Sequence, residues 1–162
     1  MRPLTIAILG AAALLAACSD SSPAVDPSAT AGAADGAQDA NTVEYFNVVV
    51  GDRVFFETDS HNLTTEAQHV LSKQAQWFAA NPGTTAMIEG HADERGTREY
   101  NLALGARRAN STRAFLISQG VDGGRLRTVS FGKERPVALG SDLQAWSQNR
   151  RGVTVVAGAP TS

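Results

Sequence analysis

The chain has 162 residues, which is enough for one domain with a hydrophobic core and too few for two domains of ordinary size. Its 14 lysine and arginine residues nearly balance 16 acidic residues, and the formal net charge is -2. This balance argues against a nucleic-acid-binding protein, which usually carries a basic excess. Cys18 is the single cysteine, so an intramolecular disulfide is excluded.

The first 17 residues have the plan of a secretory signal peptide. Arg2 supplies the positive start, and the apolar stretch 4–15 is too short to span a bilayer stably. Residues 15–18 read Leu-Ala-Ala-Cys and resemble the bacterial lipobox, in which the cysteine is acylated and becomes the new N-terminus. We therefore predict lipidation at Cys18; the alternative is an ordinary signal peptide that ends near a cysteine by coincidence. Ser19 follows the cysteine, which by resemblance to the sorting rule of enteric lipoproteins favours the outer membrane.

The segment 18–42 is predicted to be a flexible tether behind the lipidated N-terminus. From Ser19 to Thr42 it contains no aromatic residue, lysine or arginine, and Val25 is its single large aliphatic residue. Such a composition cannot bury enough apolar surface to offset the entropy lost on ordering. We expect one folded domain over residues 43–158 and a disordered tail over 159–162.

The folded domain is predicted to alternate strands and helices. Thr64 and Thr97 are placed to cap two long helices, in each of which apolar residues recur at helical spacing. The alternation predicts an α/β (α+β) two-layer sandwich with the helices packed on the sheet, and both Trp77 and Trp146 are expected in its core. The expected elements are strands over 46–50 and 53–57, a helix over 64–80, a strand over 85–89, a helix over 97–119, a strand over 126–131, a helix over 142–149 and a strand over 151–157.

Several motifs in this domain together resemble one known family. They are GDRVFF (51–56), EGHADERGT (89–97), YNLALG and RRAN (100–105 and 107–110), FGKERP (131–136) and QNRR (148–151). In this order, over about residues 43–157, they resemble the peptidoglycan-associated lipoproteins, whose domain also closes OmpA-like porins.

The resemblance implies a fold and a function. It implies an OmpA-like βαβαβ-type domain that binds peptidoglycan non-covalently, without enzymatic activity and without a cofactor. It also implies TolB and other Tol-system proteins as partners, within the Tol–Pal system that supports envelope integrity and outer-membrane invagination during cell division. The protein would be lipid-anchored in the outer membrane and face the periplasm.

The chemistry of the proposed ligand agrees with the residues present. Diaminopimelate, the cross-linking residue of Gram-negative peptidoglycan, has a free end with one ammonium and one carboxylate, which suit a carboxylate acceptor and a forked guanidinium donor. Asp93 precedes the helix over 97–119, on which Asn101, Gly105 and Arg108 share one face. Gly105 either leaves room for a ligand or permits close helix packing.

The resemblance assigns five residues to the ligand site. Asp93 and Arg108 match the main binding pair, and Asp59, Arg95 and Asn101 match supporting positions; the alternative for each is a surface ion pair or a helix cap. Family members often carry an aromatic residue directly before the aspartate that matches Asp59, where this chain has Thr58.

Other patterns in the sequence point to alternative functions. His91 with Asp93, and Asp59 with His61, have metal-ligand spacing, but the sequence lacks a closed zinc pattern, so no metal is predicted. The serines form no nucleophile elbow. The competing functions are a periplasmic amidase or metallohydrolase that acts on the same polymer, and an interaction module that binds Tol-system proteins alone. The arginine pair 150–151 is expected to brace the fold by pairing with loop acids.

Overall fold

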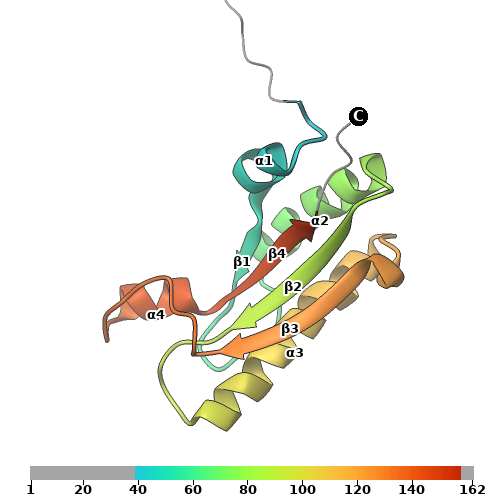
Figure 1. The fold of residues 1–162 in the computed structure, drawn as a ribbon. Coiled ribbons are helices and arrows are strands. Elements are labelled where there is room, and N and C mark those ends of the chain that lie inside the picture. Colours follow the sequence, from blue (N-terminus) through green and yellow to red (C-terminus); the bar gives the residue numbers. More distant parts are fainter. Residues whose placement is uncertain (1–38, 158–162) are drawn as a thin grey trace, which may run out of the picture. The chain divides into compact units, whose positions relative to one another are not determined.

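The structure is a computed structural model that describes residues 39–157, coloured in Figure 1. The predicted signal peptide, the lipidation site Cys18, most of the predicted tether and the tail 159–162 lie outside the described residues. No helix within residues 39–157 is long and apolar enough to cross a membrane.

The domain has two layers, with α2 and α3 on one face of a four-stranded sheet (Figure 1). Its elements are α1 (Val43–Tyr45), the π-helix η1 (Phe46–Gly51), β1 (Arg53–Phe55), α2 (Thr65–Ala80), β2 (Thr85–His91), α3 (Arg98–Ser118), the short 3-10 helix η2 (Gly123–Arg125), β3 (Leu126–Gly132), α4 (Leu143–Asn149) and β4 (Arg151–Ala157). The strand order is β1-β4-β2-β3, with β4 antiparallel to β1 and β2, and β2 parallel to β3. The predicted two-layer α/β class is confirmed.

The two long helices begin where their capping residues predict. The side-chain oxygen of Thr64 accepts a hydrogen bond from the Ala67 amide at 3.2 Å, and that of Thr97 accepts one from the Tyr100 amide at 3.2 Å. Each cap satisfies an amide that has no partner within its helix. The start of α3 is therefore fixed directly behind the loop that carries Asp93.

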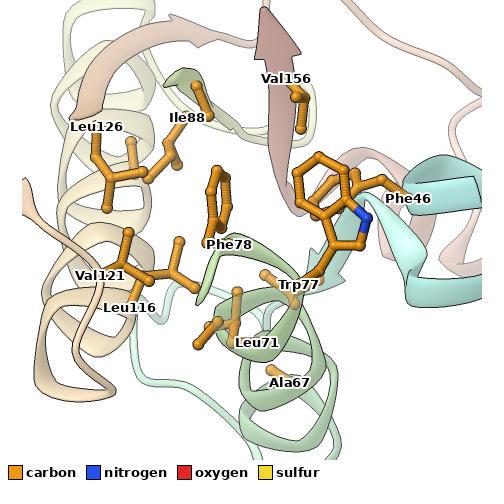
Figure 2. Packing of buried hydrophobic residues seen from close by; sticks show 14 of the residues in the cluster. Phe46, Ala67, Leu71, Trp77, Phe78, Ile88, Leu116, Val121, Leu126 and Val156 are labelled. Carbon is orange, nitrogen blue, oxygen red and sulfur yellow. The ribbon is translucent and has the colours of Figure 1, made fainter. Parts of the chain in front are cut away.

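The core lies between the helices and the sheet and is centred on aromatic rings (Figure 2). Phe46 and Phe78 are fully buried, and the ring of Phe46 lies 4.8 Å from that of Trp77. Ile88 of β2 and Leu116 of α3 complete the contact between the two layers. Burying an apolar side chain of this size contributes about 1.5–3 kcal/mol.

The predicted strand over 46–50 is wrong, because this segment forms the π-helix η1. A strand would place Phe46 and Val48 on the same face, yet Phe46 is buried and Val48 is exposed. The aromatic cluster of α2 holds Phe46, and this packing outweighs the β-propensity of the valines that follow. Contacts with the domain also begin before the predicted boundary at residue 43, since the Trp77 indole N–H donates to the Ala40 carbonyl at 2.7 Å.

Glycine at position 105 serves close packing of α3 on the sheet. A Cβ atom there would lie 2.4 Å from Ser130 Oγ and 2.7 Å from the Gly90 carbonyl oxygen. The helix therefore rests directly on the backbone of β2, and Gly105 is not among the residues that line the pocket described below. Of the two explanations for this glycine, the packing explanation is the correct one.

Candidate functional site

A pocket of about 280 Å³ lies at the edge of the sheet where β1 and β2 end. Because β4 is antiparallel to both strands, β1 and β2 run in the same direction, and the loops that follow them meet at one edge. The first half of α3 supplies the remaining wall. The lining residues include all five predicted from the sequence and are Thr58, Asp59, Asp93, Arg95, Gly96, Tyr100, Asn101, Leu104 and Arg108.

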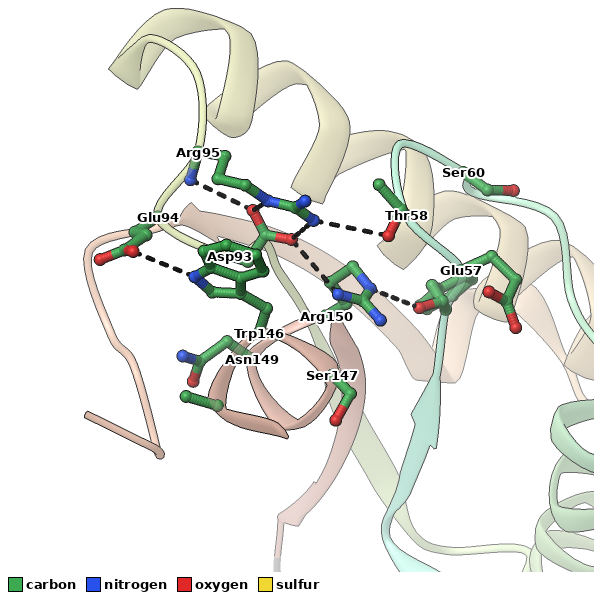
Figure 3. A network of polar contacts seen from close by, with 12 residues as sticks. Glu57, Thr58, Ser60, Asp93, Glu94, Arg95, Trp146, Ser147, Asn149 and Arg150 are labelled. Atoms are coloured by element: carbon green, nitrogen blue, oxygen red, sulfur yellow. Dashed lines mark hydrogen bonds and ion pairs between the residues drawn. The ribbon is translucent and has the colours of Figure 1, made fainter. Parts of the chain in front are cut away.

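Asp93 is buried and accepts hydrogen bonds from two arginines (Figure 3). Its Oδ1 accepts from the backbone amide and the Nε of Arg95, both at 3.1 Å. Its Oδ2 accepts from Arg95 Nη2 at 2.6 Å and from Arg150 Nη1 at 3.4 Å. Burial acts to raise the pKa of Asp93, but the hydrogen bonds from Arg95 and Arg150 outweigh it and hold the pKa below its ordinary value. Asp93 is therefore an ionised carboxylate at neutral pH.

Arg108 is fully buried, and its guanidinium donates to backbone carbonyls of the loop after β1 and of the last residue of β2. The acceptors are Ser60 and His91, each at 2.8 Å, and Glu57 at 3.1 Å. Within the described residues 39–157 no aspartate or glutamate forms an ion pair with it. Burial lowers its pKa to about 10, so the group is still charged at neutral pH. The backbone carbonyls around Arg108 therefore accept hydrogen bonds from its guanidinium but do not neutralise its charge.

Asp59 and Tyr100 form the rim of the pocket. Asp59 has a positive φ of 54°, an uncommon conformation for a residue other than glycine, and its Oδ1 accepts a hydrogen bond from the Tyr100 hydroxyl. This bond raises the pKa of Tyr100. Tyr100 is not among the site residues predicted from the sequence. Its spacing of eight residues from Arg108, with Leu104 midway, could have indicated that it shares the pocket-facing side of the helix.

Arg95 and Asn101 join the loop after β2 to the rest of the site. The Asn101 side chain is buried and donates to the Arg95 carbonyl at 2.7 Å. The Arg95 guanidinium lies 4.2 Å from the centre of the Trp146 ring, whose N–H donates to Glu94 Oε1 at 3.0 Å (Figure 3). Trp146 was predicted to be core. That prediction is wrong, because its ring is half-buried and supports the loop that carries Asp93.

The arginine pair after α4 divides between two roles. Arg150 contacts the loop acid Asp93, as predicted. Arg151 donates instead to the carbonyls of Asn149 at 3.4 Å and Arg135 at 3.1 Å, so its predicted pairing with a loop acid is wrong.

His91 takes part in a hydrogen bond and a ring stack. It is buried, hydrogen-bonded to Glu89 at 3.2 Å and stacked on the Phe131 ring. Burial, together with nearby arginines, lowers its pKa to about 4, so it is neutral at physiological pH. Among the residues that the structure describes, no three histidine, cysteine, aspartate or glutamate side chains gather closely enough to hold a metal ion.

Comparison with known proteins gives concordant matches. The model of the OmpA family matches residues 55–150. The chain is 52% identical over 158 residues to the peptidoglycan-associated lipoprotein of Rhizobium meliloti, covering 98% of this chain and 89% of that protein. It is 50% identical over 157 residues to the peptidoglycan-associated lipoprotein of Brucella abortus, covering 97% and 93%. The crystal structure of the peptidoglycan-associated lipoprotein from Burkholderia pseudomallei matches with a TM-score of 0.68 and 39% identity, over 74% of this chain and 100% of that one.

Proposed function

Because the chain belongs to the OmpA family and, within it, to the peptidoglycan-associated lipoproteins, we propose that it binds peptidoglycan non-covalently through the pocket around Arg108. This family consists of lipoproteins and not of enzymes, so the proposed activity is binding and tethering. The ligand is the free amino acid end of diaminopimelate, which carries one ammonium and one carboxylate.

The observation that carries the proposal is the buried guanidinium of Arg108, which has no acidic partner among residues 39–157. A guanidinium has five N–H groups, and the three hydrogen bonds to carbonyls leave it further donors. A carboxylate that enters the pocket gains charge-assisted hydrogen bonds and neutralises a desolvated cation. Ligands with a free carboxylate are therefore favoured over ligands without one.

The ammonium of the same ligand needs a carboxylate, and the pocket offers two. Asp59 lies at the exposed rim and accepts one bond from the Tyr100 hydroxyl, which leaves its carboxylate acceptor capacity to spare. Asp93 lies deeper and already accepts four hydrogen bonds from Arg95 and Arg150. We propose that the ammonium meets Asp59 first and reaches Asp93 by taking the place of the Arg95 side chain.

Co-sedimentation with purified sacculi tests this function. The full-length chain should pellet with sacculi, and free diaminopimelate should release it. Cadaverine, which has the same two ammonium groups and no carboxylate, should leave it bound, because Arg108 requires a carboxylate. Release by both compounds at equal concentration would show that binding is a non-specific charge effect, and failure to pellet would contradict the proposal outright.

We further propose that the domain is anchored to the outer membrane by acylated Cys18 and faces the periplasm. The part of the predicted tether that precedes residue 39 would link the domain to the lipid. TolB and other Tol-system proteins would be partners, in support of envelope integrity and of outer-membrane invagination during division. Co-purification of TolB with the tagged chain from detergent-solubilised cells tests the partnership, and its absence at wild-type expression would contradict it.

A further inference from the structure

Two arginines hold the Asp93 carboxylate from different sides (Figure 3). The Arg95 side chain lines the pocket and is 39% exposed. The Arg150 side chain is 11% exposed and is not among the pocket-lining residues. A ligand that enters the pocket can therefore compete with Arg95 for Asp93, whereas Arg150 stays behind the carboxylate.

Arg150 is itself fixed by the end of β1. Its Nε donates to the Phe56 carbonyl at 2.9 Å, and the Phe56 amide donates to the Arg150 carbonyl at 2.9 Å. The Arg150 amide also donates to the Trp146 carbonyl at 3.0 Å, which places the residue at the C-terminus of α4. The two backbone bonds fix the position of the residue, and the bond from Nε orients the guanidinium so that its Nη1 points at Asp93.

The number of hydrogen bonds that the Asp93 carboxylate can accept limits which groups can bind it at the same time. A carboxylate offers about four acceptor sites, and Arg95 and Arg150 together occupy as many. An ammonium can bind Asp93 only after Arg95 has withdrawn. At that moment Arg150 is the cation that still orients the carboxylate.

We propose that Arg150 is a positioning residue of the ligand site, which holds the Asp93 carboxylate from behind while a ligand ammonium replaces Arg95 in front. This inference rests on the proposed function, since it concerns the same pocket. It assigns to the residue after α4 a part in ligand binding that neither the motif resemblance nor the pocket lining indicates.

A change at Arg150 should also alter the titration of Asp93. The charged groups around Asp93 are Glu94 and Arg95 on its own loop, Asp59 after β1, Arg108 on α3 and Arg150 after α4. An adjacent arginine typically lowers the pKa of an aspartate by about 1–3 units. Because the hydrogen bond from Arg150 helps to hold the pKa of Asp93 down, we expect removal of the Arg150 charge to raise that pKa, although Arg95 remains.

The chain offers a matched control in Arg151. Arg150 and Arg151 are adjacent and largely buried, and both donate to backbone carbonyls, but the Arg151 guanidinium forms no ion pair with Asp93. Sacculus binding by the full-length chain should be measured from about pH 3 to pH 7 for the wild type, Arg150→Gln, Arg150→Lys and Arg151→Gln. Thermal unfolding at each pH reports on folding separately.

Binding requires ionised Asp93 and is therefore lost as the pH falls through its pKa. We expect the midpoint of this loss to rise in Arg150→Gln and to stay at the wild-type value in Arg151→Gln. Arg150→Lys keeps the charge and should restore the midpoint. A residue that only braces the fold would change the unfolding temperature in both glutamine variants and leave the midpoint where it was.

An unchanged midpoint in folded Arg150→Gln, or an equal shift in Arg151→Gln, would overturn the inference. If Arg150→Gln does not fold, Arg150→Lys tests the inference instead. A single lysine ammonium cannot donate to both the Phe56 carbonyl and the Asp93 carboxylate as the arginine guanidinium does. Its affinity for free diaminopimelate should then fall severalfold, and an unchanged affinity would overturn the inference. Failure of the wild-type chain to bind sacculi would instead contradict the proposed function.

Discussion

Replacement of Arg108 by lysine is the most direct test of the pocket. The change keeps the positive charge and removes the planar fork. The guanidinium now spans three carbonyl oxygens, those of Ser60 and His91 at 2.8 Å and that of Glu57 at 3.1 Å, and still faces the pocket. A lysine ammonium carries three donors on one nitrogen atom, so it cannot bond the loop after β1 and the end of β2 and also bind a carboxylate at two points.

The expected loss of affinity in Arg108→Lys follows from the burial of the Arg108 charge. Loss of one partner of a buried, hydrogen-bonded charge pair typically costs about 2–5 kcal/mol. Since lysine retains the charge, we expect the lower end, about 2 kcal/mol, which corresponds to a roughly 30-fold weaker affinity. Arg113→Lys is the control, because Arg113 lies on the same helix and donates to the carbonyls of Leu126 and Gly123 away from the pocket.

Titration calorimetry with free diaminopimelate measures the affinities, and thermal unfolding measures the stability of each variant. Both substitutions should lower the unfolding temperature, since each removes hydrogen bonds to partly buried carbonyls. The Arg108 variant alone should lose affinity. Binding by folded Arg108→Lys within about threefold of wild type would refute the idea that the fork of this arginine receives the ligand carboxylate.

Three further outcomes follow from the sequence and the structure. Cys18→Ala should leave unprocessed precursor or a soluble periplasmic form; normal amounts of the mutant in the outer-membrane fraction would contradict lipidation. Deletion of residues 19–38 should leave the unfolding temperature unchanged, whereas deletion through residue 42 should lower it, because the Trp77 indole loses the Ala40 carbonyl. Burial lowers the pKa of His91 to about 4, below its ordinary value of 6.5. The unfolded chain therefore takes up the proton first, so stability should fall as the pH drops from about 6.5 to about 4, and His91→Gln, followed by thermal unfolding across this range, should flatten that fall.

The parts of the fold that the sequence predicted depend on local signals. The caps Thr64 and Thr97 and the apolar spacing within each helix are properties of short windows, and both helices begin directly after the predicted caps. Four of the five candidate site residues could be named because they lie in compact motifs, and Asp59 follows GDRVFF closely; the parallel direction of β1 and β2 brings these segments together.

The features that the sequence did not predict depend on partners far along the chain. The run 46–50 has strong β-propensity, but Phe46 packs on Trp77 and Phe78, which no local window contains. Trp146 was assigned to the core because it is large and apolar, whereas its N–H bonds Glu94, 52 residues away. The reason for Gly105 is a steric limit set by the backbone of β2, and only the assembled sheet reveals it.

The departure from the family pattern at Thr58 bears on how readily Arg95 leaves Asp93. The Thr58 hydroxyl accepts a hydrogen bond from Arg95 Nη2 at 3.4 Å, a contact that a phenylalanine at this position could not provide. This bond is long and exposed, so it contributes less than about 1 kcal/mol. Thr58→Val removes it at nearly constant volume, and we expect the affinity for free diaminopimelate to rise about twofold because Arg95 is easier to displace. Thr128→Val, on β3 outside the pocket, removes a comparable exposed bond and should have no effect. A weaker affinity in Thr58→Val would mean that Arg95 supports the ligand in the position seen here, and that Asp93 acts through Arg95 without contacting the ammonium itself.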